Sequence, residues 1–251
     1  PLLDGPGWGE LVNEARTNVG MAPYFDDPSS LPSTDWQDVI FRTAGIQSYD
    51  LSMSGGSEKT QYMVSGNFFD QTGVVIGSGY KRGNFRINLD QTINSRLNAG
   101  LNLTLSRSKT DRIDAGSNSG IVSAAIIKSP AVPLYLEDGT LNPNDPYIAT
   151  SNNPALMAQE ITNYAFNNRA IGNVFLNLEL FDGLNLRSSL GIDYLSLDEV
   201  LFIPPNNLTY EGRSTNGSGT NSFTQDRGWI NENTLNYATT LGNKHRINVL
   251  L

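Results

Sequence analysis

Residues 97–106 read LNAGLNLTLS, and apolar and polar residues alternate along the whole of this run. Because successive side chains of a β-strand point to opposite faces, the run predicts one strand with an apolar face and a polar face. Strands of globular proteins are usually five or six residues long, whereas a tilted strand that crosses a membrane needs about nine to eleven. The ten residues of this run therefore favour a membrane-spanning β-strand.

The same alternation recurs along most of the chain from about residue 46 onward, and it predicts eight strands. The other seven lie near residues 48–53, 61–68, 85–90, 173–180, 184–193, 229–241 and 245–251. The alternation is clear in most of them. It is weakest in the last two, where Asn231 and Asn233 fall in phase with Leu235 and Tyr237.

The connections between these strands alternate in length. Short connections at 55–59, 94–95, 182–183 and 242–244 are rich in the Gly, Asn and Asp residues that tight hairpin turns require. Long connections lie between them, at about 71–79, 109–168 and 196–227. Every second connection of an antiparallel meander lies at the same end of the sheet. All short turns are therefore expected at one end, and all long loops at the other, as in outer-membrane barrels.

The composition excludes several classes of function. The chain has 251 residues, 17 Lys and Arg against 25 Asp and Glu, a net charge of −8, no Cys and one His. Nucleic-acid binding needs clustered cations, and a disulfide framework or thiol nucleophile needs Cys. His245 alone cannot build a histidine-rich metal site. We therefore expect no nucleic-acid partner, no cofactor and no metal ion.

The polar face of the strands differs from an ordinary soluble surface. The chain has 28 Asn but only 5 Lys, whereas soluble sheets usually carry long charged side chains on the wet face. The charged strand residues follow the polar phase, which predicts a barrel lumen or a plug contact. The lumen- or plug-facing candidates are these charged residues together with Asn88, which shares their phase. They are Asp50, Arg86, Asn88, Asp90, Glu179, Arg187 and Asp193. Only Arg107 follows the apolar phase, and its place after Leu105 predicts a side chain that reaches the lipid headgroups.

These patterns predict an all-β fold, namely an antiparallel up-and-down transmembrane β-barrel segment of about eight strands with long outer loops that contain short helices. Residues 1–45 are expected to form an outer loop region with a helix near 8–19, and residues 46–251 an incomplete barrel. Two further helices are expected in the large loop, near 121–128 and 154–161. The main alternative is a soluble β-sandwich that binds carbohydrate, with its apolar faces packed together and short turns at both ends.

Three local motifs suggest other chemistry, but their spacing does not fit. Residues 77–83 read GSGYKRG and match no phosphate-binding loop. Oxygen ligands gather at 137–145 and at Asp111 and Asp114, yet the spacing of a calcium-binding EF-hand is missing. The single His lies beside a tight turn, so no Ser-His-Asp triad is expected. We therefore predict no catalytic residues and no enzyme activity.

Several motifs, in order along nearly the whole chain, strongly resemble the SusC/RagA family of TonB-linked outer-membrane transporters. They are TDWQDVIFRT at 34–43, LSMSGGSEKT at 51–60, FDQTG at 69–73, RINLD at 86–90, PLY at 133–135, EDGT at 137–140, NNP at 152–154 and LGIDY at 190–194. The resemblance implies a plug domain and a 22-stranded barrel, of which this chain would cover an early part without the plug.

The same resemblance implies the function and the partners. Members of this family import oligosaccharides, and sometimes peptides, across the cell outer membrane. They work with a SusD-like surface lipoprotein that closes over the barrel, and TonB supplies energy through the plug region. We therefore expect outer-membrane lipid around the barrel. The polypeptide alone is not expected to transport a ligand.

Aromatic side chains of the large outer loop are the predicted ligand contacts, because aromatic faces pack against sugar rings and large loops carry binding residues. The candidates are Tyr135, Tyr147, Tyr164 and Phe166. The alternative role for each is packing against neighbouring strands or the lid.

Overall fold

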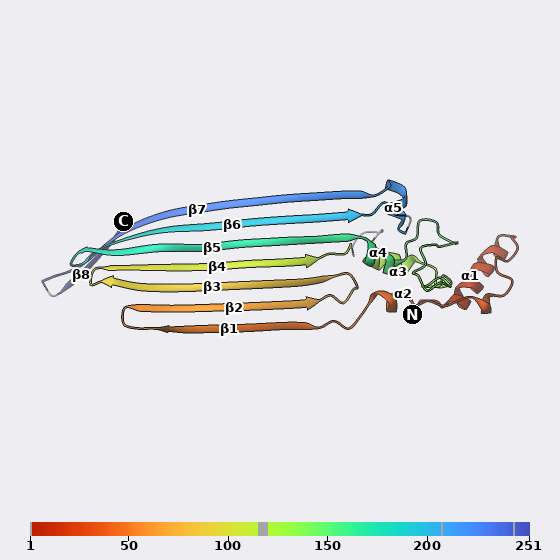
Figure 1. Ribbon diagram of the computed structural model, residues 1–251, viewed down its shortest axis with the longest axis horizontal. Coiled ribbons are helices and arrows are strands. Elements are labelled where there is room, and N and C mark those ends of the chain that lie inside the picture. Colours follow the sequence, from red (N-terminus) through yellow and green to blue (C-terminus); the bar gives the residue numbers. More distant parts are fainter. Residues whose placement is uncertain (1, 115–119, 207, 243) are drawn as a thin grey trace.

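The computed structural model describes residues 2–114, 120–206, 208–242 and 244–251. Within these ranges the chain forms one antiparallel sheet of eight strands, each paired with the next along the chain (Figure 1). The strands are β1 (Ile46–Gly56), β2 (Thr60–Thr72), β3 (Gly79–Asn94), β4 (Leu97–Asp111), β5 (Thr162–Phe181), β6 (Leu184–Ile203), β7 (Ser218–Leu241) and β8 (His245–Leu250). The predicted fold class, a β-barrel segment, is confirmed.

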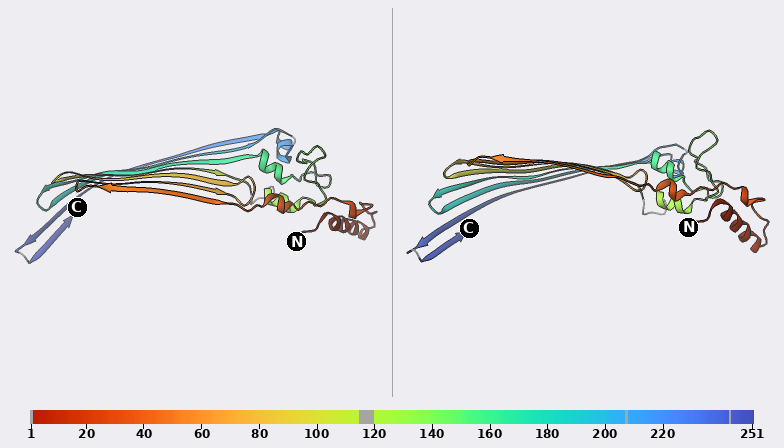
Figure 2. Two further views of the ribbon diagram at one scale, coloured as in Figure 1. Left: turned by 60° about the horizontal axis from the view of Figure 1, so that its bottom comes forward. Right: turned by 90° about the horizontal axis from the view of Figure 1, so that it is seen from below.

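The sheet is an open, gently curved single layer (Figure 2). Among the described residues β1 pairs only with β2, and β8 pairs only with β7, so the eight strands do not close on themselves. A β-sandwich needs a second sheet packed against the first. The described part of the chain contains no second sheet, and the sandwich alternative is therefore wrong.

The short turns and the long loops lie at opposite ends of the sheet, as predicted (Figure 1). Asp182 and Gly183 join β5 to β6, and Gly183 has a φ of +88°, a conformation that favours glycine. Asn243, which comes between β7 and β8 in the sequence, lies outside the described residues.

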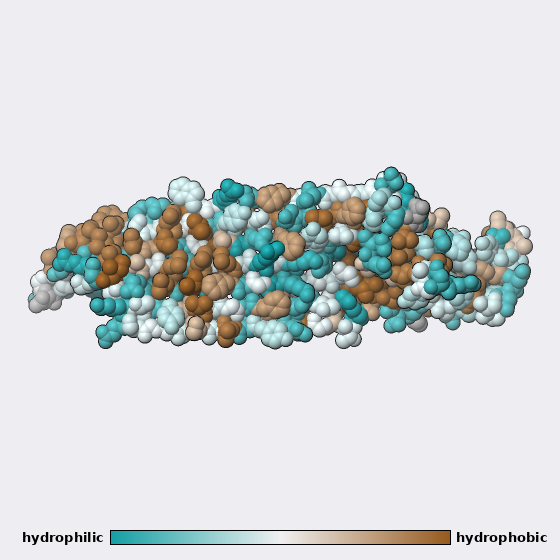
Figure 3. Space-filling view, in the orientation of Figure 1, coloured by the Kyte–Doolittle hydropathy of each residue, from teal (hydrophilic) through white to brown (hydrophobic). Residues whose placement is uncertain are grey.

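The register places every alternating run in phase across the sheet. On one face, Leu101 lies opposite Leu89 of β3 and Val174 of β5. On the other face, Asn102 lies opposite Asn88 and Asn173. We call these the outer face and the polar face. Figure 3 shows one side of the sheet, where hydrophobic residues gather toward the turn end and hydrophilic residues cover the middle.

The strands extend further toward the loops than the sequence predicted. The expected loops at 109–168 and 196–227 are shorter, because β5 begins at Thr162, β6 ends at Ile203 and β7 begins at Ser218. β5 and β6 have 20 residues each and β7 has 24. A membrane crossing needs only about nine to eleven residues. The alternation near these loop ends is broken by residues such as Asn168, a polar residue on the outer face, and Leu201, an apolar residue on the polar face, which hid the extra strand length.

Short helices gather at the loop end of the sheet (Figure 1). They are α1 (Gly5–Asn18), the 3₁₀ turn η1 (Pro28–Ser30), α2 (Trp36–Ile40), α3 (Ile121–Ile127), α4 (Pro154–Glu160) and α5 (Tyr210–Thr215). The three predicted helices correspond to α1, α3 and α4. The helix α2 was not predicted from the sequence, although Asp35 caps it by accepting from the backbone N–H groups of Gln37 and Asp38.

The only sizeable buried apolar cluster of the described residues lies among these helices. It consists of Trp36, Ile40, Ile121, Ala124, Ala125, Val132 and Met157. We call the assembly of α2, α3, α4 and the segment 128–153 the loop cap. No helix in the described ranges is long and apolar enough to cross a bilayer.

Candidate functional site: the polar face and the loop cap

The seven lumen- or plug-facing candidates share the polar face. The register aligns Arg86 with Thr104, Ile171 and Asp193 in one row across the sheet. Each other candidate lies an even number of residues away from the residue of its own strand that belongs to this row. An even separation along a strand places two side chains on the same face. Whether this face lines a lumen stays a prediction. The shared face itself follows from the register.

Hydrogen-bonded amides link neighbouring strands on the polar face. The Asn67 side-chain amide donates to the Asp50 carboxylate at 2.7 Å, and the Asn84 amide donates to the Asn67 carbonyl oxygen at 3.2 Å. Asn102 donates to Asn173 at 3.1 Å. Short amides satisfy one another across the 4.7–4.9 Å strand spacing without filling the space above the sheet. Such hydrogen bonds between neighbouring strands explain why Asn is frequent on the polar face.

Asp193 has a partner that the sequence analysis missed. The Arg169 guanidinium donates to both carboxylate oxygens, at 3.0 and 2.7 Å, in a bidentate pair. Arg169 was overlooked because residues 109–168 were expected to be a loop, which placed it at a strand end. Arg169 lies four residues before Asn173, and this even spacing is the signal that shows the shared face.

Arg187 belongs to a stack on the polar face. Its guanidinium lies 4.1 Å from the centre of the Phe175 ring and donates to Asn177 at 3.0 Å. Phe175 lies over Gly100 of β4, where a Cβ atom would approach the ring to 2.1 Å. Glycine therefore lets the ring lie against the strand, and the ring supports the cation.

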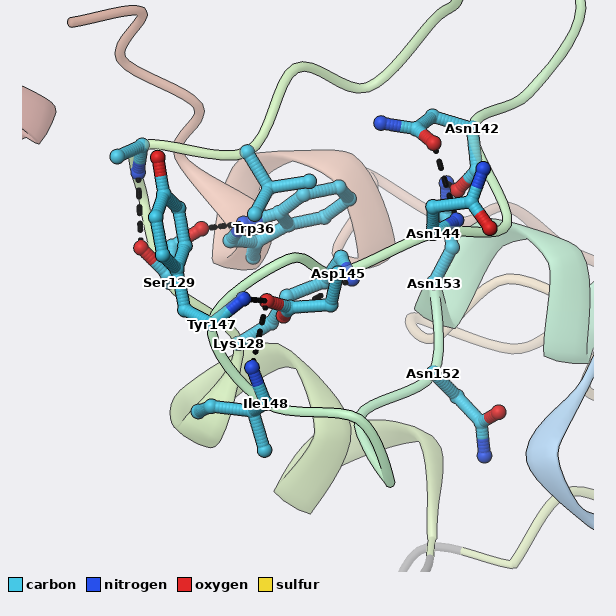
Figure 4. Close-up of polar contacts among 12 residues, drawn as sticks. Trp36, Lys128, Ser129, Asn142, Asn144, Asp145, Tyr147, Ile148, Asn152 and Asn153 are labelled. Atoms are coloured by element: carbon cyan, nitrogen blue, oxygen red, sulfur yellow. Dashed lines mark hydrogen bonds and ion pairs between the residues drawn. The ribbon is translucent and has the colours of Figure 1, made fainter.

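A buried ion pair holds the loop cap together (Figure 4). The Lys128 ammonium lies 3.3 Å from an Asp145 carboxylate oxygen, and both side chains are fully buried. Lys128 also lies 5.3 Å from the centre of the Trp36 ring. Burial lowers the pKa of Lys128, and the attraction and hydrogen bond of Asp145 oppose this shift. Asp145 further accepts from the backbone N–H groups of Tyr147 and Ile148.

Two adjacent Asn residues, from the NNP motif at 152–154, join separate loops. Asn153 is fully buried, caps α4 through the N–H group of Ala155, and donates to the backbone oxygen of Asn142 at 3.0 Å. Asn152 donates to the Glu211 carboxylate at 2.7 Å and accepts from the backbone of Tyr210 at 2.6 Å. The large loop is thereby tied to α5, between β6 and β7.

The four predicted ligand aromatics do not gather in one place. Tyr135 is exposed in the loop cap. Tyr147 packs against Trp8 and Phe25, with ring centres 4.9 and 5.7 Å away. The prediction that Tyr164 and Phe166 lie in the loop is wrong, because both belong to β5. They face the outer side, in register with Asp111 and Lys109 of β4.

The acidic cluster at 137–145 uses its oxygens internally. Asp138 accepts from the backbone N–H and the hydroxyl of Thr140, and these hydrogen bonds lower its pKa. Asp145 pairs with Lys128, as described above. Asp111 pairs with Lys109 at 2.6 Å. No group of three or more possible metal ligands occurs among the residues that the structure describes.

A cavity of about 780 Å³ lies between the loop cap and the ends of β4 to β6. Its polar lining includes Arg112, Asn163, Tyr164 and Glu211, and its apolar lining includes Met157 and Ile161. Arg112 also pairs with Glu199 of β6. This cavity was not predicted from the sequence, because its lining comes from three separate connections of the chain.

Comparisons with known proteins agree with this architecture. No protein family profile matches the chain. The chain is 32% identical over 243 residues to the TonB-dependent receptor P26 of Formosa agariphila. The aligned region covers 95% of this chain and 24% of that receptor. It is 28% identical over 196 residues to the TonB-dependent receptor SusC of Bacteroides thetaiotaomicron, covering 69% of the chain and 19% of SusC. The chain thus spans about a quarter or less of the curated relatives it matches.

Solved structures share the fold. The RagAB peptide importer in its closed-closed state matches with a TM-score of 0.70 at 20% identity, over 97% of this chain and 29% of that chain. A second RagAB peptide transporter structure matches with a TM-score of 0.69 at 22% identity, over 88% of this chain and 25% of that chain. Sequence similarity to TonB-dependent receptors and this matching sheet identify the chain as a SusC/RagA-like TonB-dependent transporter segment.

Proposed function

We propose that this chain forms an early part of the barrel of an outer-membrane importer for oligosaccharides or peptides. In this proposal residues 1–45 belong to the outer loop region and residues 46–251 to the barrel. A plug in another part of the receptor receives energy from TonB, and a SusD-like lipoprotein covers the loop end. The names of the relatives, receptors and transporters, support a role in transport rather than catalysis.

The separation of the two sheet faces carries the proposal. Leu51 is 79% exposed and Trp229 is 76% exposed, both on the outer face, and the polar face carries hydrogen-bonded amides and ions. Apolar side chains this exposed are stable in lipid and unfavourable in water. A barrel wall with lipid outside and a polar lumen inside fits both faces.

Within this proposal the polar face contacts the plug or the passing ligand. The amides of Asn67, Asn84 and Asn102 offer hydrogen bonds of the kind that sugar hydroxyl groups and peptide bonds both accept. The Arg169–Asp193 pair and the stacked Arg187 add charges. The printed description of RagAB as a peptide importer supports peptides, and the resemblance to SusC supports oligosaccharides.

Tyr135 is the ligand contact that the loop cap supports best, because this residue is 54% exposed. Tyr147 remains a candidate, although its ring already packs on Trp8 and Phe25. Phe166 lies on the outer face of β5 and does not line the cavity, so we assign it to the lipid side instead of the ligand. Tyr164 shares this face but also lines the cavity beside the loop cap.

Uptake by the whole receptor in its native outer membrane tests this function. Cells would be supplied with a panel of fluorescent oligosaccharides and a mixture of fluorescent peptides, with and without an intact TonB system. We expect TonB-dependent uptake of one of the two classes. Tyr135→Ala should reduce that uptake, whereas Phe166→Ala should leave it unchanged. Recovery of the receptor from the soluble fraction, or uptake independent of TonB, would contradict the proposal.

A further inference from the structure

Three cations stand together on the outer face, just beyond the apolar residues. Lys81 of β3 lies directly opposite Lys109 of β4, and Arg107 precedes Lys109 by two residues. All three continue the phase of Leu103 and Leu105, so they point to the same side as the apolar band. Of the three, only Arg107 was placed in this phase from the sequence, because both strands extend further toward the loops than predicted.

The height of this cluster matches the edge of a membrane. Ten residues separate Leu97 from Arg107, and ten residues of an antiparallel strand extend about 34 Å. At a strand tilt of about 40°, that distance rises about 26 Å, close to the roughly 25 Å apolar band of outer-membrane barrels. Arg107 therefore stands at the boundary on the loop side, where the outer leaflet has its headgroups.

Aromatic rings of β5 hold two of these cations in place. The Arg107 guanidinium lies 5.2 Å from the centre of the Phe166 ring, and the Lys109 ammonium lies 5.5 Å from the centre of the Tyr164 ring. Such contacts limit the rotamers that the long side chains explore, and they leave the donor groups available. This packing explains why aromatic residues occur at these two positions.

The charges of the cluster are not balanced within the described residues. Lys109 pairs with Asp111 at 2.6 Å, and Lys81 pairs with Asp70 at 3.0 Å. No described carboxylate lies within 4.0 Å of Arg107, which is exposed. Three cations against two carboxylates leave this group with a net charge of +1, and the cation without a carboxylate partner is Arg107, so an added anion beside the group is attracted.

We propose that Arg107, Lys109 and Lys81 bind the phosphate group of a phosphorylated glycolipid in the outer leaflet. This inference rests on the proposed function, because it requires the outer face to contact the outer membrane. A lipid suits the cluster better than free phosphate, since its acyl chains would lie along Leu105 and Phe85 below the cations. Several weak contacts then act together on one molecule.

The polar face offers a matched control cation. Arg82 is next to Lys81 in β3 and lies opposite Ser108, at the same height but on the other face. Its guanidinium lies 5.8 Å from the centre of the Phe69 ring, so it is also a cation held by an aromatic ring. If glycolipid binds only on the outer face, substitution of Arg82 should therefore not change the amount of bound glycolipid.

The test is to purify the whole receptor from outer membranes in mild detergent and to quantify bound phosphorylated glycolipid per receptor by mass spectrometry. The double substitution R107Q/K109Q should lower the bound glycolipid about 25-fold, because each of the two cations near a lipid surface contributes about a factor of five. K81Q, at a 59% exposed side chain, should lower it less. R82Q should leave it at the wild-type level, and R107K/K109R should retain most of it.

Each outcome bears on the proposal. Heat-dependent gel migration shows whether each variant is a folded barrel. If the double variant does not fold, the bound glycolipid of the K81Q receptor tests the proposal instead. Unchanged glycolipid in folded R107Q/K109Q or K81Q receptor overturns the lipid site but not the proposed function. Release of glycolipid by millimolar inorganic phosphate would show a free-anion site and overturn the lipid assignment. Absence of the wild-type receptor from the outer membrane would overturn both.

Discussion

The sheet and the loop cap place their apolar side chains in opposite environments. In the loop cap, Trp36 is 2% exposed and Ile40 is fully buried, and even the charges of Lys128 and Asp145 are buried as a pair. In the sheet, the large apolar side chains of the outer face remain exposed. The cap has the core of a water-soluble protein, whereas the sheet depends on its surroundings to cover its apolar face.

This difference teaches which interactions stabilise each region. Backbone hydrogen bonds hold the strands in register whatever surrounds them, and in the proposed function lipid supplies the apolar contact on one side. The cap has no regular sheet and relies on packing, helix capping and one buried ion pair. Substitutions of the same chemical kind should therefore have different effects in the two regions.

The largest effect is expected from Asp145→Asn in the cap. The substitution leaves the buried Lys128 ammonium without its carboxylate, and an unpaired buried charge typically costs about 3 to 5 kcal/mol. Hydrogen exchange of residues 120–160 in the whole receptor would measure the loss. Asp70→Asn is the matched control, because its partner Lys81 is mostly exposed, and it should cost less than about 1 kcal/mol.

A double substitution sharpens the same point. Lys128→Met with Asp145→Leu removes both charges and should cost much less than Asp145→Asn alone, because no charge is left unpaired. Equal losses for the single and double variants would show that the hydrogen bonds of Asp145 to Tyr147 and Ile148 matter more than its charge.

In the sheet, the expected effect depends on the face. Leu103→Arg places a cation in the middle of the outer face and should cost about 2 to 4 kcal/mol in lipid. Asn102→Arg, one residue earlier on the polar face, should cost less than half of that. Urea unfolding of the receptor in lipid vesicles gives both values. Equal costs for the two substitutions would contradict the assignment of the faces.

The pH dependence of the cap should follow Lys128. Its folded pKa is lowered by burial, so the unfolded cap binds more protons between that pKa and the ordinary value for lysine. The free energy of cap opening should therefore rise with pH across this window. Protease cleavage within residues 120–160 at pH 7 and at pH 9.5, corrected for protease activity, measures the trend. The Lys128→Met/Asp145→Leu variant should lose it.

The two regions also differ in how much of them the sequence predicts. Alternation in a strand depends on neighbours two residues apart, so residues 97–106 alone predicted their strand, and the spacing of short turns predicted the order of the sheet. The lumen- or plug-facing candidates fell on one face because parity fixes a side chain once its strand is known.

The cap could not be predicted in the same way, because its contacts join distant parts of the chain. Trp36 donates its indole N–H to the backbone oxygen of Ser129, 93 residues away, and Asn152 binds Glu211, 59 residues away. No local period marks such pairs. Tyr164 and Phe166 were misplaced for a related reason, since the ends of β4 and β5 are set by pairing between strands and not by local alternation.

The smallest effect on stability is expected from Arg169→Gln on the polar face. Arg169 and Asp193 form a bidentate pair, but both side chains are about half exposed, and exposed pairs contribute only about 0 to 1 kcal/mol. If the polar face contacts the plug or the ligand, uptake should fall clearly while urea unfolding in vesicles is almost unchanged. Arg227→Gln, in β7 on the outer face, is the matched control and should alter neither. A loss of stability as large as that of Asp145→Asn would show that the polar face, like the cap, is held together by its charges.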